Sequence, residues 1–481
     1  MNLDVSSQQF HQWLEQAGKL IEEYYNQKKE QKVFAGKSPE EVMALFEEPL
    51  PERGMQMEDL LDKVRDDVLG SITNSAGPRY YGYITGGGNQ AAVLAEMIKA
   101  SLNQNNLKWH SSPVSTEMER LVMRWVAEFI GYPTGSAGVL LSGGSVANHN
   151  CLAVARTIKA PVNVAEEGLY NCPLLTVYVS EEGHSSFDKG VDMLGIGKKY
   201  LRKIPTNDDL QMDTEALEKK ILEDKDAGFY PICAIGVAGT TNNGALDDLK
   251  AVSRICKKYD LWFHVDAAYG GPAAAVPKVS SYFDGIKEAD SVVINPHKWM
   301  YVPFEAGGVL VKNPEHLRQT FSTIPDYLKS DKEDRTRTDL MEYNLPLTKE
   351  FKSLKVWMTL KTYGAAKIRE TIEADIDKAT YLVRKVKGHS NFEMVAPAPL
   401  SIVCFRYNPG GLDNSALDSL NDSIVERIES DGRVFLTGTK IKGISALRVC
   451  FINHRTTNED IDFLVKTVAE IGQKAYREAN I

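Results

Sequence analysis

The sequence has few cysteines, no long apolar run and no excess of positive charge. Its six cysteines are scattered over 481 residues without a C-x-x-C pair, which argues against a disulfide framework or a cysteine zinc site and favours a reducing compartment. No segment offers roughly 18 consecutive apolar residues, the length that a membrane-spanning helix needs. The net charge of −9 argues against a nucleic-acid partner. We therefore expect a cytoplasmic protein that binds neither membranes nor nucleic acids, and we expect no metal site.

The chain also lacks internal repeats and low-complexity tracts, and three stretches differ in their pattern. Residues 1–87 predict mainly helices. Residues 88–355 alternate short apolar runs with helical segments, and residues 356–481 predict fewer strands followed by long helices. We predict an N-terminal helical segment, a large α/β domain and a small C-terminal α+β domain with these bounds.

Two helix starts can be placed from capping boxes, in which a Ser or Thr precedes a Glu by three residues. The first is formed by Ser38 and Glu41, with Pro39 at the first helical position. The second is formed by Thr456 and Glu459, and it predicts the beginning of the last helix.

Five apolar runs in the central range predict buried strands. Helical stretches such as residues 246–260 lie between most of them. Continuous apolar strands that alternate with helices indicate a mostly parallel sheet covered by helices on both faces. The sequence therefore predicts an α/β fold, with strands at 138–142, 174–180, 232–239, 261–266 and 291–295.

Four features lie just beyond the carboxyl ends of these predicted strands, where open α/β sheets bind their ligands. One is Gly143-Gly144-Ser145, between a strand and a helix. Small residues let the backbone approach a ligand, and the N–H groups at a helix N-terminus favour an anion such as phosphate. An ordinary tight turn explains the same residues, so this feature does not decide alone.

The second and third features are an acid and a histidine. Asp266 ends an apolar strand, and a buried carboxylate needs a partner, either a structural arginine or a cationic ring nitrogen of a cofactor. His184 follows another strand, and its ring either has a structural role or stacks on a planar cofactor.

The fourth feature is Lys298, within Asn-Pro-His-Lys-Trp-Met after the strand 291–295. A surface lysine is the ordinary alternative, but it fits poorly between these neighbours. A lysine in a semi-apolar pocket loses proton affinity and becomes nucleophilic toward carbonyl groups. The four features together match a ligand with a phosphate, a planar ring, a protonated pyridine nitrogen and an aldehyde. Pyridoxal 5′-phosphate has these groups, so we expect it as the cofactor.

At these motifs the sequence resembles the group II pyridoxal-phosphate-dependent amino-acid decarboxylases, which include the aromatic-L-amino-acid, histidine and glutamate decarboxylases. The resemblance runs from about Pro78 to Arg448 and is carried by SSPVSTEMERLVMRW, GHSSFDKG, HVDAAYGG, NPHKWM, DYLK and FKSLKVWMTLKTYG. It implies fold type I, a homodimer whose N-terminal helices wrap the partner subunit, and an active site at the dimer interface.

The resemblance also implies roles for single residues. Lys298 is expected to bind the cofactor aldehyde, Asp266 to pair with the pyridine nitrogen, and His184 to stack on the ring. Val146 stands where many relatives have glutamate, and we interpret this departure as tuning rather than loss. The further cofactor contacts implied are Gly144, Ser145, Thr241, Ala268, and Asn295 or His297.

The implied reaction is release of carbon dioxide from an L-amino acid to give the amine. The family's side-chain pocket matches residues 78–88, with a contribution from the other subunit near residues 103–113. Its tyrosines suit a flat apolar side chain, although packing of the N-terminal helices explains them equally well. We expect an aromatic substrate such as tyrosine, phenylalanine, tryptophan or DOPA, in a pocket of Tyr80, Tyr81, Tyr83, Ile84, Asn105, Leu107 and Arg448.

Two alternatives stay open. One is an acidic or other polar substrate, such as glutamate, cysteine sulfinate or 2,4-diaminobutyrate. An acidic substrate needs a buried cation, for which Arg79 is a candidate. An aldehyde synthase or aminotransferase of the same fold is the other. Tyr327 bears on the aldehyde synthase, because the resemblance makes it the acid that delivers a proton after carbon dioxide leaves. Relatives with phenylalanine at this place form the aldehyde, so Tyr327 favours the amine.

Overall fold

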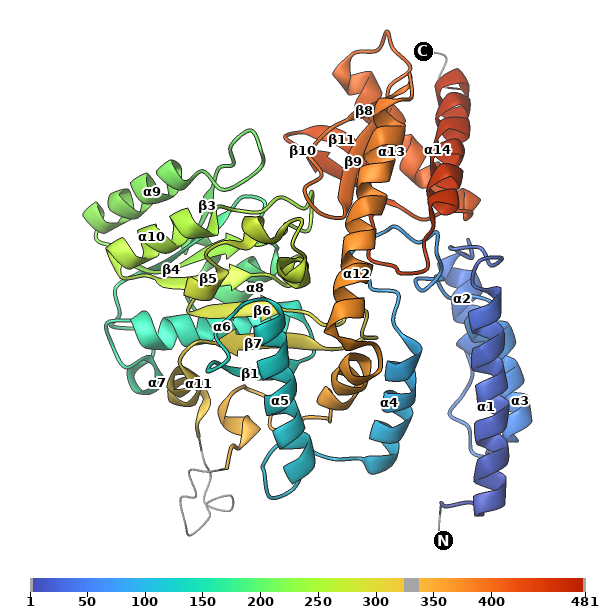
Figure 1. The fold of residues 1–481 in the computed structure, drawn as a ribbon, viewed down its shortest axis with the longest axis horizontal. Coiled ribbons are helices and arrows are strands. Elements are labelled where there is room, and N and C mark those ends of the chain that lie inside the picture. Colours follow the sequence, from blue (N-terminus) through green and yellow to red (C-terminus); the bar gives the residue numbers. More distant parts are fainter. Residues whose placement is uncertain (1–2, 324–336, 479–481) are drawn as a thin grey trace. The chain divides into compact units, whose positions relative to one another are not determined.

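The computed structural model describes residues 3–323 and 337–478, which fold into two compact units (Figure 1). The large unit contains Ile84–Thr380 with Ala396–Cys404, and the small unit contains Met1–Tyr83, Tyr381–Val395 and Phe405–Ile481. The N-terminal helices thus share a unit with the C-terminal α+β part, and the predicted division into three domains stays a prediction. No helix among the described residues is long and apolar enough to cross a membrane.

A seven-stranded sheet, counted over the described residues, forms the centre of the large unit. Its strands lie in the order β1-β7-β6-β5-β4-β2-β3, and β7 runs antiparallel to both of its neighbours. The remaining neighbours pair in parallel, so β1 also runs in the direction of β6. The bounds are β1 (Ala137–Leu141), β2 (Leu175–Ser180), β3 (Leu201–Ile204), β4 (Tyr230–Val237), β5 (Trp262–Asp266), β6 (Ser291–Ile294) and β7 (Gly307–Val311).

Helices pack against both faces of this sheet (Figure 1). Successive residues of a strand point to opposite faces. Ile235 of β4 belongs to the apolar core that Cys151 of α6 also joins, while the next residue, Gly236, lies against Leu249 of α10. The bounds are α4 (Gln90–Leu102), α5 (Pro113–Phe129), α6 (Gly144–Lys159), α7 (Val164–Glu167), α8 (Ser186–Met193), α9 (Thr214–Asp226), α10 (Leu249–Tyr259), α11 (Pro314–Phe321) and α12 (Ser353–Lys387).

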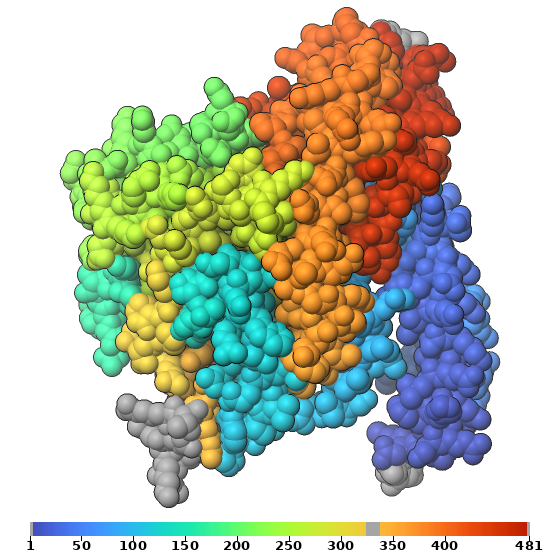
Figure 2. All heavy atoms as spheres, in the orientation of Figure 1, coloured from blue at the N-terminus to red at the C-terminus, as the bar shows by residue number. Residues whose placement is uncertain are grey.

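The predicted α/β fold with a mostly parallel sheet is confirmed. All five predicted strands are present, within a few residues of their predicted ends. On one face of the large unit, α5 and the N-terminal part of α12 lie side by side, and Trp125, Phe129 and Leu360 line a cleft between them (Figure 2). Helix α12 is interrupted at Gly364, whose φ of 73° is not helical.

The small unit combines the N-terminal helices with a four-stranded sheet in the order β10-β11-β9-β8, counted over the described residues. The capping box of Ser38 and Glu41 is confirmed at the start of α2. The predicted second box is wrong by one residue, because Thr457 and Asp460 form it. The bounds are α1 (Ser7–Gln27), α2 (Pro39–Phe46), α3 (Met57–Lys63), β8 (Phe392–Met394), β9 (Ile402–Tyr407), α13 (Asn414–Asp431), β10 (Thr437–Ile441), β11 (Ile444–Cys450) and α14 (Asn458–Glu478).

The physical reason for this shift is a competing hydrogen bond. The Thr456 hydroxyl donates to the Pro78 carbonyl at 2.7 Å and is therefore engaged outside the helix. Two threonines precede two acids in this stretch, and tertiary contact selects the pair that caps the helix.

A buried ion pair stabilises β1 at the edge of the large sheet. The Leu140 N–H donates to Glu119 Oε1 at 2.8 Å, and the Leu140 carbonyl accepts from Lys349 Nζ at 2.7 Å. Lys349 also contacts Glu119 directly, and Asn106 Nδ2 donates to the other Glu119 oxygen at 3.0 Å. Burial lowers the pKa of Lys349. The side-chain pair thus satisfies backbone groups that a further strand would otherwise satisfy.

We expect Lys349→Met to lower the free energy of unfolding by about 3–5 kcal/mol, because it leaves the Glu119 carboxylate buried without its cation. Urea unfolding followed by far-UV circular dichroism measures the change. The double variant Glu119→Gln/Lys349→Met should be more stable than Lys349→Met alone. As a control, Lys250→Met removes an exposed pair with Asp284 and should change stability by less than about 0.5 kcal/mol. Equal losses in the two single variants would contradict the assignment.

Candidate active site

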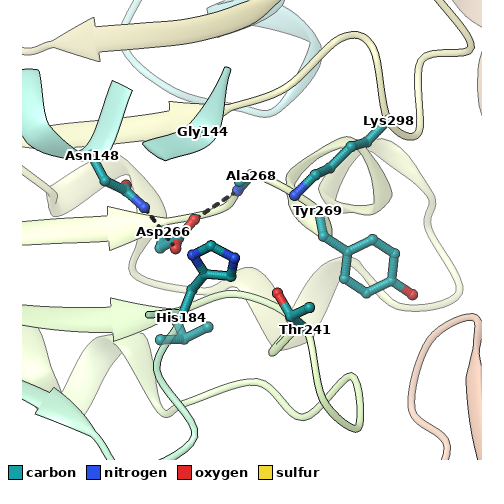
Figure 3. Close-up of a pocket in the computed structure, with 10 residues that line it drawn as sticks. Gly144, Asn148, His184, Thr241, Asp266, Ala268, Tyr269 and Lys298 are labelled. Carbon is teal, nitrogen blue, oxygen red and sulfur yellow. Dashed lines mark hydrogen bonds between the residues drawn. The ribbon is translucent and has the colours of Figure 1, made fainter. Parts of the chain in front are cut away.

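A cavity lies at the carboxyl edge of the large sheet (Figure 3). Its lining comes from the segments that follow five strands. Gly144 begins α6 after β1, His184 follows β2, Thr241 follows β4, Asp266 ends β5 and Lys298 follows β6. Ala268 also lines the cavity, so the fold brings together six of the residues that the sequence predicted for a cofactor site.

The Lys298 amine points into the cavity, toward Asp266 and His184 (Figure 3). Two side chains of the segment that follows are held by Asp375 of α12, which accepts from Trp299 Nε1 at 3.1 Å and from the Tyr301 hydroxyl at 2.7 Å. Burial raises the pKa of Asp375. These contacts fix the segment that presents the lysine.

Asp266 is 6% exposed and already has two donors within the protein. The Ala268 N–H donates to Oδ1 at 3.1 Å, and Asn148 Nδ2 donates to Oδ2 at 3.1 Å. The sequence prediction missed Asn148, which also lines the cavity. The signal that could have found it is its position four residues after Gly144, which places both on one face of α6.

The histidines of the site are neutral. Burial lowers the pKa of His184, with the positive charge of Lys298 acting in the same direction against the opposing effect of Asp266. His184 Nδ1 accepts from the Ser186 N–H at 3.1 Å, so its proton lies on Nε2. Burial lowers the pKa of His297 to about 3, and its Nδ1 accepts from the Ala306 N–H at 2.9 Å.

Backbone N–H groups and a buried amide lie together at the start of α6. The first turn contains Gly144 and Ser145, and its N–H groups have no carbonyl partner within the helix. Asn295 is 1% exposed, and neither polar atom of its side chain has a hydrogen-bond partner among the described residues. A Cβ at Gly144 would lie 2.8 Å from Asn295 Nδ2, so this amide adjoins the bare backbone. His297 lies beside Gly143. This donor set fits a phosphate group.

The residues predicted for the substrate pocket fall in both units. In the small unit, Tyr80 stacks on Phe435 with ring centroids 5.2 Å apart, and the Tyr81 hydroxyl donates to the Asp460 carbonyl at 3.1 Å. Tyr83 is 60% exposed, and its carbonyl accepts from Arg448 Nη1 at 3.2 Å. The two inner tyrosines therefore also pack the core of the small unit.

In the large unit, Ile84 is buried and Asn105 Oδ1 accepts from the Lys349 N–H at 3.0 Å. The Leu107 carbonyl accepts from the Met341 N–H at 3.1 Å. The role of these pocket residues in binding a substrate stays a prediction. Tyr327 lies outside the described residues.

Comparison with known proteins identifies the family. Residues 39–408 match the pyridoxal-dependent decarboxylase conserved domain. The chain is 32% identical over 475 residues to aromatic-L-amino-acid decarboxylase of Bacillus atrophaeus, covering 98% of this chain and 97% of that protein. It is 31% identical over 444 residues to phenylacetaldehyde synthase of Petunia hybrida, covering 89% and 87%.

Comparison with a solved structure supports the same family. Catharanthus roseus tryptophan decarboxylase in complex with L-tryptophan superposes with a TM-score of 0.91 at 27% identity, covering 98% of this chain and 100% of that one. The match over most of the chain and the shared fold lead to one conclusion. This chain belongs to the pyridoxal-dependent decarboxylases, enzymes whose cofactor is pyridoxal 5′-phosphate.

Proposed function

We propose that this enzyme releases carbon dioxide from an aromatic L-amino acid and forms the corresponding amine. The observation that carries the proposal is the meeting of Lys298, Asp266 and His184 at one cavity. Pyridoxal 5′-phosphate supplies an aldehyde that binds amines covalently and a protonated ring that accepts electrons. The residues around the cavity fit each of its groups.

Each residue has a proposed task. Lys298 holds the cofactor aldehyde, and Asp266 keeps the ring nitrogen protonated because an adjacent carboxylate favours the cation. The neutral ring of His184 stacks on the cofactor ring. Thr241 and Ala268 complete the ring site, and the phosphate lies against Gly144, Ser145, Asn295 and His297.

The aromatic substrate class has two supports. The relative from Bacillus atrophaeus is an aromatic-L-amino-acid decarboxylase, and the Catharanthus roseus enzyme was solved with L-tryptophan. The alternative of an acidic substrate depends on Arg79, whose Nε donates to the buried Asp460 carboxylate at 3.0 Å. The Arg79 guanidinium also lies 4.0 Å from the centre of the Phe463 ring. Because its charge is already compensated, Arg79 is a poor partner for a second carboxylate.

A homodimer with the active site at its interface is proposed from an exposed apolar stripe on α4. Leu94, Met97, Ile98 and Leu102 recur at helical spacing, and each is at least 40% exposed. A contiguous apolar stripe of this kind favours contact with a second protein surface. A second copy of this chain is the proposed partner. A cytoplasmic location is proposed separately, from the scattered cysteines.

The substrate class is tested by incubating the cofactor-loaded enzyme separately with each of the twenty amino acids and with DOPA. We expect carbon dioxide and amine in equal amounts from aromatic amino acids, and far less from glutamate. Lys298→Ala should fold, lose the visible absorbance of lysine-bound cofactor and turn over negligibly. Lys219→Ala, at an exposed position on α9, is the matched control and should behave as the parent. A preference for glutamate, or full activity of Lys298→Ala, would refute the proposal.

The phosphate cradle is tested by Gly144→Ala. Alanine suits the first turn of a helix, so the cofactor-free protein should be at least as stable as the parent. The new Cβ, however, displaces the Asn295 amide that it would meet at 2.8 Å. We expect the dissociation constant for the cofactor, measured by equilibrium ultrafiltration, to rise about tenfold, or about 1.4 kcal/mol.

Gly135→Ala is the control for this variant, because a Cβ at Gly135 meets nothing within 4 Å. It should bind the cofactor as the parent does. The cradle assignment fails if the two variants bind equally well.

Tyr327→Phe tests whether the product is the amine. Although Tyr327 lies outside the described residues, the DYLK motif makes it the proposed proton donor, since a phenol is neutral at working pH. The variant should keep its cofactor affinity, lose amine formation and gain aldehyde, ammonia and hydrogen peroxide, with uptake of oxygen. Amine formation at the parent's rate without oxygen uptake would show that Tyr327 is not the donor.

A further inference from the structure

Asn148 is the hub of a buried hydrogen-bond network behind the cavity. Its side chain is 1% exposed, and both of its polar atoms form hydrogen bonds. The Nδ2 atom donates to Asp266 Oδ2 at 3.1 Å and to the Ser186 hydroxyl oxygen at 3.1 Å. The Oδ1 atom lies 3.1 Å from His264 Nε2. Asn148 therefore connects three elements that surround the cavity.

The network continues away from the cavity through three further side chains. His264 Nδ1 lies 2.8 Å from the Ser291 hydroxyl, and Trp262 Nε1 donates to that same hydroxyl at 2.8 Å. Trp262, His264 and Ser291 are each no more than 1% exposed. A continuous chain thus runs from an indole N–H to the Asp266 carboxylate without leaving the interior.

The chemistry of these groups determines which atom donates in each hydrogen bond of the network. An indole N–H is a donor only, so Ser291 accepts from Trp262. The roles at His264 follow from the other end of the network: the Asp266 carboxylate only accepts, so Asn148 faces it with Nδ2 and turns Oδ1 toward His264 Nε2. With Nε2 as the donor, a neutral His264 accepts from the Ser291 hydroxyl at Nδ1. His264 is neutral, because burial lowers its pKa to about 4. Its proton is then on Nε2 and faces Asn148 Oδ1. This contact leaves the Asn148 amide hydrogens for Asp266.

Reversing the donors and acceptors of this hydrogen-bond network would be unfavourable at Asp266. A proton on His264 Nδ1 would leave Nε2 as an acceptor, and Asn148 would turn its Nδ2 toward His264. Its Oδ1 would then face Asp266 Oδ2 at about the hydrogen-bond distance, with two acceptors in contact. An ionised, buried Asp266 would lose one of its two donors, a loss that costs most for charged groups.

We propose that Asn148 is a positioning residue for Asp266, and that Trp262, Ser291 and His264 fix the direction in which Asn148 donates. The ionised carboxylate is thereby held in place for the ring nitrogen. Because Asn148 also donates to Ser186, whose N–H binds His184, the same side chain supports the segment that carries the stacking ring. This inference rests on the proposed role of Asp266.

The first test is Asn148→Asp, which keeps the side-chain shape but places a second carboxylate oxygen against Asp266. Two buried carboxylates at this distance do not both ionise. We expect the dissociation constant for pyridoxal 5′-phosphate to rise at least about tenfold. We also expect kcat to fall by at least about thirtyfold, with KM changed by less than about threefold. Thermal unfolding of the cofactor-free protein verifies that the variant folds.

Asn150→Asp is the matched control on the same helix. Asn150 is 3% exposed and donates to the Tyr343 carbonyl at 3.3 Å, so this variant also buries a carboxylate but does not contact Asp266. Its cofactor affinity should stay within about threefold of the parent. Equal losses of affinity in the two variants would mean that any buried acid on α6 has this effect, and would overturn the proposal.

The second test is a double-mutant cycle between Ser291→Ala and Asn148→Leu. Ser291→Ala alone should weaken cofactor binding by about threefold to tenfold, because His264 loses the donor that sets its tautomer. If Ser291 acts through Asn148, Ser291→Ala should have less than about a twofold effect in the Asn148→Leu background. Additive effects would overturn the directional chain.

Asp266→Asn separates failure of this inference from failure of the proposed function. If Asp266→Asn weakens cofactor binding and lowers kcat while Asn148→Asp does neither, Asn148 is not a positioning residue and the role of Asp266 stands. If Asp266→Asn changes neither quantity, the proposed role of Asp266 fails, and the inference fails with it.

Discussion

Hydrogen bonding between parallel strands decides where the site forms. The register of β2, β4, β5 and β6 makes these strands end at one edge of the sheet, and β1 is aligned with them through the reversed strand β7. The chain therefore leaves the sheet repeatedly at the same edge. Residues as far apart in sequence as Gly144 and Lys298 reach one cavity without any direct attraction between them.

The chemistry of the cavity depends on which of its buried side chains carry a charge. Burial lowers the pKa of His184, His264 and His297, so these rings are neutral and act as hydrogen-bonding or stacking groups. Asp266 accepts two hydrogen bonds from within the protein, one from Asn148 and one from the Ala268 N–H. The Asp266 carboxylate lines the cavity beside neutral rings, so it attracts a cation that enters the cavity. The electrostatic selectivity proposed for the ring nitrogen follows from this contrast.

Sequence reasoning predicted what local patterns determine. The apolar runs gave five strands, and the residues at their ends gave Asp266, Lys298 and His184. Strands β3 and β7 were missed, because the first is four residues long and the second begins with two glycines. The helix start at Thr457 was missed because a contact with Pro78 engages the neighbouring threonine.

The remaining gaps concern contacts between distant segments. Asn148 looks like an ordinary helical residue until its neighbours from β5 and α8 are known. The support of the Lys298 segment by Asp375 likewise joins residues that no local pattern connects. The residues predicted for the substrate pocket are distributed over both units, and the resemblance also implies a second subunit. A single chain's sequence contains no spacing that encodes such an assembly.

The donors that Asp266 receives from Ala268 and Asn148 have a consequence for folding in the absence of the cofactor. A buried carboxylate without donors would strongly disfavour the folded state until a cation arrived. Here the polypeptide satisfies that carboxylate itself, so folding does not have to wait for the vitamin-derived cofactor. The cofactor-free protein therefore already holds the Asp266 carboxylate in the orientation that a cation entering the cavity would meet.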